Sequence, residues 1–200
     1  HVETMEKAGI EKWFIDSCGK IKYMFPKAHA AAYVMSAIRL GWYKVHMPLV
    51  FYCAFLSVAP GGFESSMVEK GKRGVLDRIS EIEAKGNDAT QKEKDMITAL
   101  QMVYECLARG IEFLPVDLMK SDSFKFLPEN GKIRMPFSSI DGIGENAAIK
   151  IKEARDSNEI FSVEDFQQKT RLSKAVMDLL ERNHVFDDMS KSNQLSMFDF

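Results

Sequence analysis

The sequence predicts a mostly α-helical chain with one small antiparallel β element, and three observations lead to this fold class. Apolar residues recur at helical spacing through most of the first 110 positions. The pattern then changes to short extended stretches around an Asn-Gly pair, which is typical of a hairpin turn. Helical spacing returns after residue 137 and is interrupted by a Gly-x-Gly turn at residues 142–144.

Composition limits the possible functions. The 200 residues are 46% hydrophobic, which is enough for a core and allows one large domain or two small ones. The 27 basic residues are offset by 29 acidic ones, so any contact with nucleic acid must come from local placement of charge. Cys18, Cys53 and Cys106 are scattered in apolar surroundings, which indicates buried thiols in a reducing cytoplasm rather than a disulfide framework or a zinc site.

The ends of the chain and its longest apolar run give three further expectations. No signal peptide is recognisable, and residues 47–59 form an apolar run too short to span a bilayer, so we expect no membrane contact. The chain has no initiator Met and begins inside a predicted helix. We therefore expect it to be a piece of a larger protein.

The first half of the chain predicts helices. Residues 2–7 and 11–23 form two short ones separated by Gly9. A longer helix over residues 28–47 follows Pro26, a residue suited to a helix start, and stops before Pro48. Residues 49–57 are apolar on all sides and predict a buried helix.

The next elements are set by turn and cap signals. After a break at residues 60–62, the Gly-Lys-Arg-Gly sequence at 71–74 predicts a basic, solvated loop before an amphipathic helix over 75–84. Thr90 and Glu93 have the spacing of a capping box, and the helix behind them stops at Gly110. The expected strands are residues 113–119, 124–127 and 132–135, with a turn at 128–131.

The last third predicts three short helices and a tail. The first starts near Glu145, the second at a cap on Ser162, and the third at a cap on Ser173. His184 ends the third helix, where it would interact with the helix dipole. Residues 187–193 are polar and are expected to be mobile.

The helix over residues 28–47 has two different faces when its residues are spaced at about 100° each. The predicted core face holds Ala31, Val34, Met35, Ile38, Trp42 and Val45. The other face is rich in cations and tyrosines, and no Asp or Glu occurs between Pro26 and Gly62. Such a face suits a polyphosphate and a stacked base, although a solvated helix face is the alternative. The candidate nucleotide-binding residues are Lys27, His29, Tyr33, Arg39, Tyr43 and Lys44.

The Gly-x-Gly turn predicts a phosphate site. Two glycines allow a tight turn with uncovered amides, and the first free N–H groups of the following helix point the same way. Such donors bind one phosphate without reading base identity. The candidate DNA-binding residues are Gly142, Ile143, Gly144, Glu145, Asn146 and Lys150, with Lys152 adding charge. The alternative is an ordinary loop before a helix.

The final residues read as a peptide for a partner's groove. Gln194, Leu195, Met197 and Phe198 follow a polar segment, and large apolar side chains left in water each forgo about 1.5–3 kcal/mol of burial. Met197 and Phe198 would fill one pocket, Leu195 a neighbouring one, and Gln194 would make orienting hydrogen bonds. The alternative is that this tail folds back on its own domain.

Three segments carry a resemblance. Residues 25–33 read Phe-Pro-Lys-Ala-His-Ala-Ala-Ala-Tyr, residues 140–146 form a turn that resembles a helix-hairpin-helix motif, and residues 194–198 read Gln-Leu-Ser-Met-Phe. In this order they resemble the C-terminal end of the bacterial DNA polymerase III α subunit, family C, PolC type. The resemblance covers essentially the whole chain.

The resemblance implies a division of labour. Residues 1–114 would be part of a helical fingers module that binds the incoming dNTP, residues 115–188 a duplex-binding module for primer-template DNA, and residues 189–200 a flexible tail for the sliding clamp (β). Catalytic aspartates with their Mg²⁺ would lie in a palm domain outside this chain, so this part of a DNA-directed DNA polymerase would be inactive alone. The location would be the cytoplasmic replisome of a bacterium.

A rival class remains open. A non-catalytic helix-hairpin-helix DNA-binding or repair module with a clamp-binding peptide would explain the hairpin and the tail. It would not explain the acid-free face with cations and tyrosines.

Overall fold

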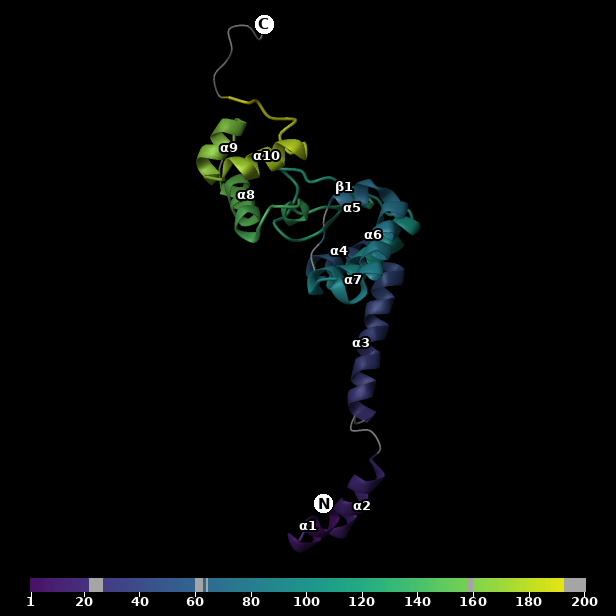
Figure 1. The fold of residues 1–200 in the computed structure, drawn as a ribbon. Helices are drawn as coiled ribbons and strands as arrows, with labels where there is room; N and C mark the ends of the chain where they lie inside the picture. The colour runs from purple at the N-terminus through teal and green to yellow at the C-terminus, as the bar shows by residue number, and fades with distance from the viewer. Residues whose placement is uncertain (22–26, 60–62, 64, 158–159, 193–200) are drawn as a thin grey trace, which may run out of the picture. The chain divides into compact units, whose positions relative to one another are not determined.

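The computed structural model describes residues 1–21, 27–59, 63, 65–157 and 160–192, and within them the chain is mostly helical, as predicted (Figure 1). The chain forms two compact units, His1–Trp42 and Tyr43–Phe200. Unit 1 contains α1 (Val2–Lys7), α2 (Lys12–Lys20) and most of α3 (Lys27–His46), which continues into unit 2. Gly9, with φ +74°, separates α1 from α2 as the sequence predicts.

Helix α4 (Pro48–Val58) begins with Pro48 in its first turn, which explains why α3 stops immediately before it. Tyr52, Cys53 and Leu56 are buried on one face. Val50 is 43% exposed and Ala54 is also exposed, so the prediction of a helix buried on all sides is wrong. An evenly apolar sequence does not show which face will meet a neighbour, and here one face packs against α7 and the sheet.

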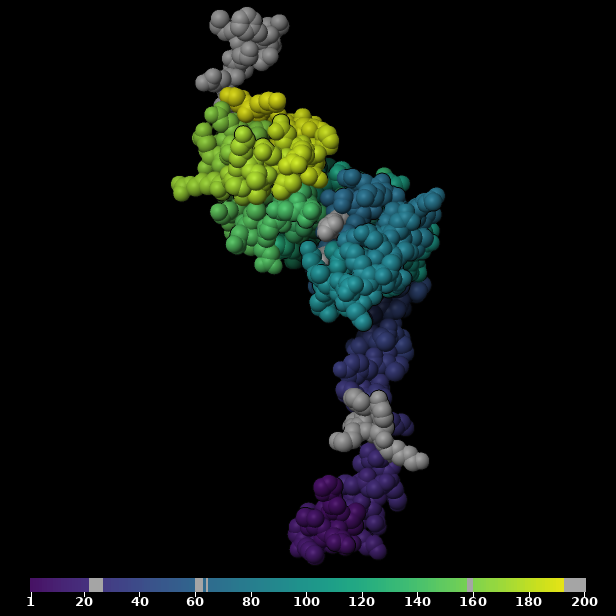
Figure 2. All heavy atoms as spheres, viewed as in Figure 1, coloured from purple at the N-terminus to yellow at the C-terminus, as the bar shows by residue number. Residues whose placement is uncertain are grey.

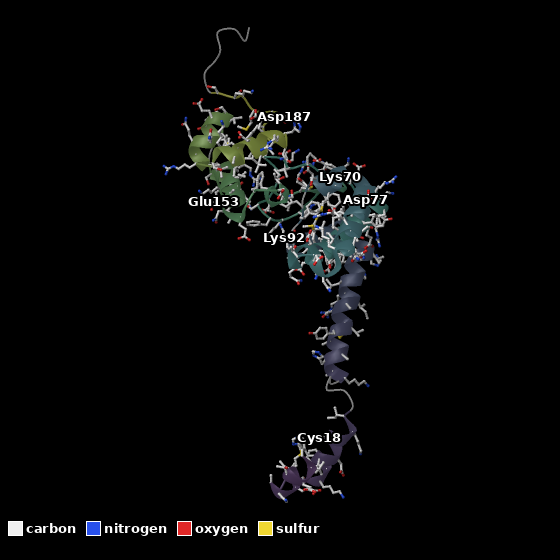
Figure 3. All side chains as sticks on the ribbon, viewed as in Figure 1. Cys18, Lys70, Asp77, Lys92, Glu153 and Asp187 are labelled. Carbon is white, nitrogen blue, oxygen red and sulfur yellow. The ribbon has the colours of Figure 1, made fainter. Side chains whose placement is uncertain are left out.

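The three cysteines differ in environment. Cys53 and Cys106 are buried, as predicted, and burial raises the pKa of each thiol to about 12. Cys18 on α2 is exposed, which contradicts the prediction (Figure 3). In α2 the buried residue is Ile15, and a helix of 9 residues is too short to be buried on more than one side.

Helices α5 (Ser66–Glu69), α6 (Gly71–Lys85) and α7 (Gln91–Ala108) follow, with a short 3₁₀ turn η1 (Gly86–Asp88) before α7. Helices α6 and α7 pack along each other, and Val75 and Ile82 of α6 are buried. The predicted basic loop at residues 71–74 is wrong, since these residues form the first turn of α6. Two glycines lower helix propensity, but tertiary packing of the apolar face overrides it.

The predicted capping box at the start of α7 is confirmed. The Thr90 hydroxyl accepts a hydrogen bond from the Glu93 amide at 3.2 Å, and the Glu93 carboxylate accepts one from the Thr90 amide at 2.9 Å. The Lys85 ammonium donates to the same carboxylate at 2.6 Å. The hydrogen bonds from Lys85 and Thr90 lower the pKa of Glu93 to about 2.

Three short strands form a mixed sheet in the order β1-β3-β2. Strands β2 (Leu127–Glu129) and β3 (Lys132–Arg134) are antiparallel, and Asn130 and Gly131 both have positive φ between them, as the Asn-Gly signal predicts. Strand β1 (Phe113–Leu114) lies within a predicted strand, but it pairs with β3 in parallel, whereas the sequence predicts an antiparallel element.

The strands are shorter than predicted because two aspartate side chains form local turns with the backbone that follows them. The Asp117 carboxylate accepts the amide of Met119 at 2.8 Å, and the Asp122 carboxylate accepts the amide of Phe124 at 3.1 Å. These local turns end the extended conformation after β1 and delay β2.

A second 3₁₀ turn, η2 (Phe137–Ser139), leads to α8 (Glu145–Ser157), α9 (Val163–Thr170) and α10 (Lys174–Arg182). The predicted caps are confirmed, since Ser162 accepts the amide of Asp165 and Ser173 accepts the amide of Val176. His184 lies just beyond α10, where its ring Nδ1 is 3.0 Å from the Asp187 carboxylate.

A single hydrophobic cluster runs through unit 2. It extends from Tyr52 on α4, through Ile133 on β3, to Phe186 after α10. The predicted boundary at residues 114–115 lies inside this cluster, and as a division of function it stays a prediction.

The segment after α10 makes backbone hydrogen bonds with α9. The Ser190 and Lys191 carbonyls accept the amides of Val163 and Glu164 at 2.9 and 3.2 Å. The mobility expected of this segment stays a prediction. The sequence shows only that this segment is polar, whereas the acceptors that it supplies to α9 depend on the tertiary fold. In Figure 2, residues 163–192 form one continuous surface in green to yellow.

Candidate nucleic-acid interface

The Gly-x-Gly turn is built as a tight hairpin. Gly142 has φ +87°, a conformation that favours glycine, and the amide of Ile143 donates to the Ile140 carbonyl at 3.0 Å. Ile140 and Ile143 are both buried and anchor the turn in the core. The Gly144 carbonyl accepts the amides of Ala147 and Ala148, each at 3.0 Å, and so starts α8.

The hairpin leaves a group of main-chain donors exposed. Within the described part of the chain, the amides of Gly142, Gly144, Glu145 and Asn146 meet no acceptor, and all four residues are exposed. Ile143 differs, since its amide is engaged in the turn and its side chain is buried. The Asp141 and Glu145 carboxylates lie beside these donors, so attraction for a phosphate must come from the amides and the helix dipole.

Three side-chain contacts fix the direction of α8. The Ser123 hydroxyl donates to the Ala148 carbonyl at 3.1 Å, and the Lys152 ammonium donates to the Asp122 carboxylate. Arg155 donates to the carbonyls of Ser121 and Leu118. The loop between β1 and β2 therefore holds the helix whose N-terminus carries the exposed amides.

The two lysines of α8 are in different situations. Lys150 is exposed, whereas Lys152 is partly buried in its ion pair with Asp122. Burial alone would raise the pKa of Asp122, but the hydrogen bond from Lys152 and those from two backbone amides bring it below its usual value. The predicted extra charge of Lys152 is therefore compensated within the protein.

A second turn resembles the first in its position of positive φ and in its spacing to the following helix, and it was not predicted from the sequence. Arg171 has φ +51° where the first turn has Gly142, and Ser173 starts α10 where Gly144 starts α8. These positions lie 29 residues apart. Buried residues repeat at the same offset: Phe137 and Phe166, Ile143 and Leu172, Ala148 and Met177, Ile151 and Leu180. The offset of these apolar residues is the signal that finds the repeat, since the second turn has no glycine.

The second turn also presents exposed main-chain donors. In the described chain the amides of Ser173, Lys174 and Ala175 meet no acceptor, and these residues are exposed. The amide of Arg171 is engaged with the Gln167 carbonyl at 2.9 Å. Lys174 stands in the first turn of α10, where α8 has the acidic Glu145.

A cleft of about 340 Å³ lies between α8 and the second turn. It is lined by Lys150, Glu153, Ala154, Ser157, Lys169, Thr170 and Arg171. Glu153, on α8 in Figure 3, is the one carboxylate among these residues, and three of them are cations. The Lys169 ammonium is ion-paired with the Asp165 carboxylate at 2.8 Å, so the charge that the cleft adds between α8 and the second turn comes mainly from Lys150 and Arg171.

The candidate nucleotide-binding residues lie on α3. Lys27, His29, Tyr33, Arg39 and Tyr43 are exposed, and the rings of His29 and Tyr33 are 4.5 Å apart. Both aromatic groups lie on one side of the helix, as the four-residue spacing predicts.

Lys44 differs from the other residues on this face. Its ammonium donates to the Glu105 carboxylate of α7 at 2.7 Å, and Arg109 contacts the same carboxylate at 2.8 Å. Burial raises the pKa of Glu105, but the hydrogen bond from Lys44 and the neighbouring charges outweigh it and hold the pKa below its usual value. Lys44 therefore joins the last turn of α3 to α7 by an ion pair within unit 2.

The prediction that one face of α3 is buried in a core is wrong. No residue of α3, all of which the structure describes, is buried, and Ile38 and Val45 are 66% and 69% exposed. The periodicity shows that a helix has an apolar face but not that this chain supplies a partner for it.

The C-terminal candidate residues are not part of the described structure. Gln194, Leu195, Met197 and Phe198 lie outside the described residues. Across the described ranges, no three His, Cys, Asp or Glu side chains gather closely enough to hold a metal ion. None of the helices that the structure describes is long and apolar enough to cross a membrane.

Comparison of the sequence with known protein families identifies the structural motif of the C-terminal part of the chain. The family described as "Helix-hairpin-helix motif" matches residues 110–195, which contain both turns. This match defines a protein with a helix-hairpin-helix motif over these residues.

The particular family follows from close relatives. The chain is 43% identical over 197 residues to the DNA polymerase III PolC-type of Oceanobacillus iheyensis and 45% identical over 197 residues to that of Caldanaerobacter subterraneus subsp. tengcongensis. It is 41% identical over 196 residues to that of Bacillus subtilis. Each match covers 98% of this chain and 14% of the relative. The chain belongs to the PolC-type DNA polymerase III family, in which it corresponds to a C-terminal segment.

Proposed function

We propose that this chain serves a replicative DNA polymerase by holding duplex DNA through its hairpins. The exposed amides at the N-terminus of α8 support this proposal, because they form a group of unengaged donors on a turn closed by the hydrogen bond from Ile143 to Ile140. A phosphate oxygen placed there gains hydrogen bonds from main-chain N–H groups and the favourable end of the helix dipole. The contact is independent of sequence, as a polymerase that copies any template requires.

The second turn extends the same proposal. The amides of Ser173 to Ala175 would take a second phosphate, with Lys174 and Arg171 supplying charge. The cationic cleft between the turns would face the backbone of the same duplex. Lys150 would be the cation of α8 that contributes to binding.

Binding of the incoming dNTP would belong to α3. Lys27, His29 and Arg39 would bind the triphosphate, and Tyr33 or Tyr43 would border the base. Lys44 would hold α3 on α7, since Glu105 already compensates its charge. Mg²⁺ would be held by carboxylates of a palm domain in the longer polymerase, and this chain would be inactive without them.

The C-terminal peptide would bind the sliding clamp in the bacterial cytoplasm. Gln194, Leu195, Met197 and Phe198 would occupy a groove on the ring, which raises the effective concentration of the polymerase at its template. The match to a PolC-type polymerase covers 98% of the chain at 43% identity, which favours this function over that of an independent repair module.

The hairpin proposal is tested by Gly144→Val. A Cβ at Gly144 meets nothing within 4 Å and its φ is not in the left-handed region, so the variant should fold and place a side chain over the exposed amides. We expect the affinity for two duplexes of unrelated sequence, measured by fluorescence anisotropy, to fall about tenfold for both.

Gly19→Val is the matched control, because Gly19 on α2 has the same open surroundings and lies outside the hairpins. Equal affinities for Gly144→Val and the control would overturn the hairpin proposal. An affinity that fell for one duplex sequence only would also contradict it, since main-chain donors carry no base specificity.

A further inference from the structure

The last described residues of the chain are tied to α9. We call residues 189–192 the strap. The amide of Val163 donates to the Ser190 carbonyl at 2.9 Å and the amide of Glu164 donates to the Lys191 carbonyl at 3.2 Å. The Ser192 hydroxyl donates to the Glu164 carboxylate at 3.1 Å. Figure 1 shows the strap in yellow beside the α9 end of unit 2.

The strap satisfies groups that the helix cannot satisfy itself. Val163 and Glu164 are the first two residues of α9, and amides in a first helical turn have no partner within the helix. Ser162 caps the amide of Asp165, so the strap carbonyls and this cap together occupy the first three amides of α9. The N-terminus of α9 is therefore closed, in contrast to those of α8 and α10.

The start of the strap is also anchored. The amide of Met189 donates to the Phe186 carbonyl at 2.9 Å, and the buried ring of Phe186 lies 5.3 Å from that of Phe166 on α9. The strap thus continues the hydrophobic cluster of unit 2 before it reaches the α9 amides.

We propose that the strap fixes the root of the C-terminal peptide on α9, so that the ring-shaped partner is kept close to the duplex held by the hairpins. This inference rests on the proposed function of that peptide. From Ser192 to Phe198 the chain spans about 20 Å at full extension. With residues 190–192 released from α9, the stretch between the last anchored residue and Phe198 grows from about six to about nine residues, and its maximal span grows to about 30 Å.

The consequence is a difference in avidity. Effective concentration falls roughly as the −3/2 power of the length of a flexible linker, so this lengthening lowers it about twofold. The intrinsic affinity of the peptide for the ring and that of the hairpins for DNA stay the same. Only binding that uses both at once should change.

The test is the double variant Val163→Pro with Ser192→Ala. Proline lacks the amide that Ser190 accepts, yet it suits the first position of a helix, and the preceding Ser162 has the extended conformation that proline requires (φ −156°, ψ 167°). The matched control is Val163→Ala with Ser192→Ala, which loses the same side chains and keeps the amide. Amide hydrogen exchange at Glu164 reports whether the strap is attached.

Three affinities are measured for each chain: for duplex DNA, for a bacterial sliding clamp, and for that clamp loaded on a duplex. We expect the proline variant to lose protection at Glu164, to match the control for DNA and for the clamp alone, and to bind the loaded clamp about twofold more weakly. Unchanged binding of the loaded clamp after loss of protection would overturn the inference. Retained protection would overturn it too, because the strap would then not depend on the Val163 amide.

Two other outcomes separate this inference from the proposed function. Weaker binding of the free clamp by the proline variant would mean that the ring binds the strap itself, which contradicts a purely positioning role. If the unaltered chain binds no clamp, the proposed function of the peptide fails and the inference fails with it. If the unaltered chain binds both partners and the proline variant does not differ from the control, the inference alone fails.

Discussion

Lys150 and Lys152 lie two residues apart on α8 and have different roles. Lys150 is exposed beside the cationic cleft, whereas Lys152 is ion-paired with Asp122 and helps to hold the helix against the loop before β2. A count of lysines near the hairpin treats the two as equal. Their partners separate a cation available for phosphate from one that stabilises the fold.

Salt dependence should distinguish the two lysines. Each phosphate neutralised by a protein cation contributes a slope of about −0.9 to the plot of log affinity against log salt concentration for duplex DNA. Lys150→Ala should therefore make the slope shallower by about 0.9, and Lys152→Ala should leave it unchanged. The slopes are obtained from duplex affinities measured by fluorescence anisotropy at salt concentrations between about 50 and about 200 mM. A shallower slope for Lys152→Ala would assign its charge to DNA instead.

The stability of Lys152→Ala should depend on pH. The folded-state pKa of Asp122 is lowered, so its charged form stabilises the fold above the ordinary aspartate pKa of 3.8, and this contribution is lost as pH falls below that value. Removing Lys152 leaves a partly buried carboxylate without its cation, which should lower the free energy of unfolding by about 1–3 kcal/mol at neutral pH. Chemical denaturation should show this difference shrinking below about pH 4. A difference that stayed constant down to pH 2 would place its cause elsewhere.

Arg171 shows why one half of the site was not predictable residue by residue. Glycine at position 142 signals a positive φ because few other residues accept it, whereas arginine at 171 gives no such signal. The structure holds Arg171 in this conformation because buried Phe166 and Leu172 fix the turn on both sides. The first hairpin is therefore predictable from its glycines, whereas no single residue of the second turn predicts it.

At the scale of elements, short-range signals were reliable and burial was not. The capping box of α7, the Asn-Gly turn and the serine caps of α9 and α10 depend on neighbours within a few residues, and each is confirmed. The apolar face of α3 and the strap depend on segments far away in the sequence or outside it. Periodicity identifies such a face but not its partner, and polarity does not show where a carbonyl will find a donor.

The cationic face of α3 leads to a prediction at this scale. In a PolC-type polymerase that carries this segment, Arg39→Ala should lower kcat/KM for nucleotide incorporation about 10- to 100-fold, because a charge-assisted hydrogen bond to phosphate contributes about 1.5–3 kcal/mol. Steady-state incorporation of a single nucleotide measures this. Arg73→Ala is the control, since Arg73 is also an exposed arginine in a helix. Equal kinetics for the two variants would remove α3 from the nucleotide site.

At the scale of the whole molecule, the two kinds of binding proposed for unit 2 would share one core. A single hydrophobic cluster supports both hairpins, and the strap extends from the same cluster toward the C-terminal peptide. The chain spans 14% of the length of its relatives. In the proposed function, this segment would carry the hairpin surface and the origin of the peptide on one core.

The peptide itself gives the last prediction. Replacing Phe198 with Ala in the polymerase removes one large apolar side chain, and the loss of about 1.5–3 kcal/mol of burial should weaken clamp binding about 10- to 100-fold. Processive synthesis on a clamp-loaded template should fall accordingly, while distributive synthesis without the clamp stays the same, because the hairpins and α3 are untouched. Ser196→Ala, within the same peptide, should leave both activities unchanged. If Phe198→Ala slowed distributive synthesis equally, the tail would act on the polymerase itself, and the fold-back alternative would replace clamp binding as its function.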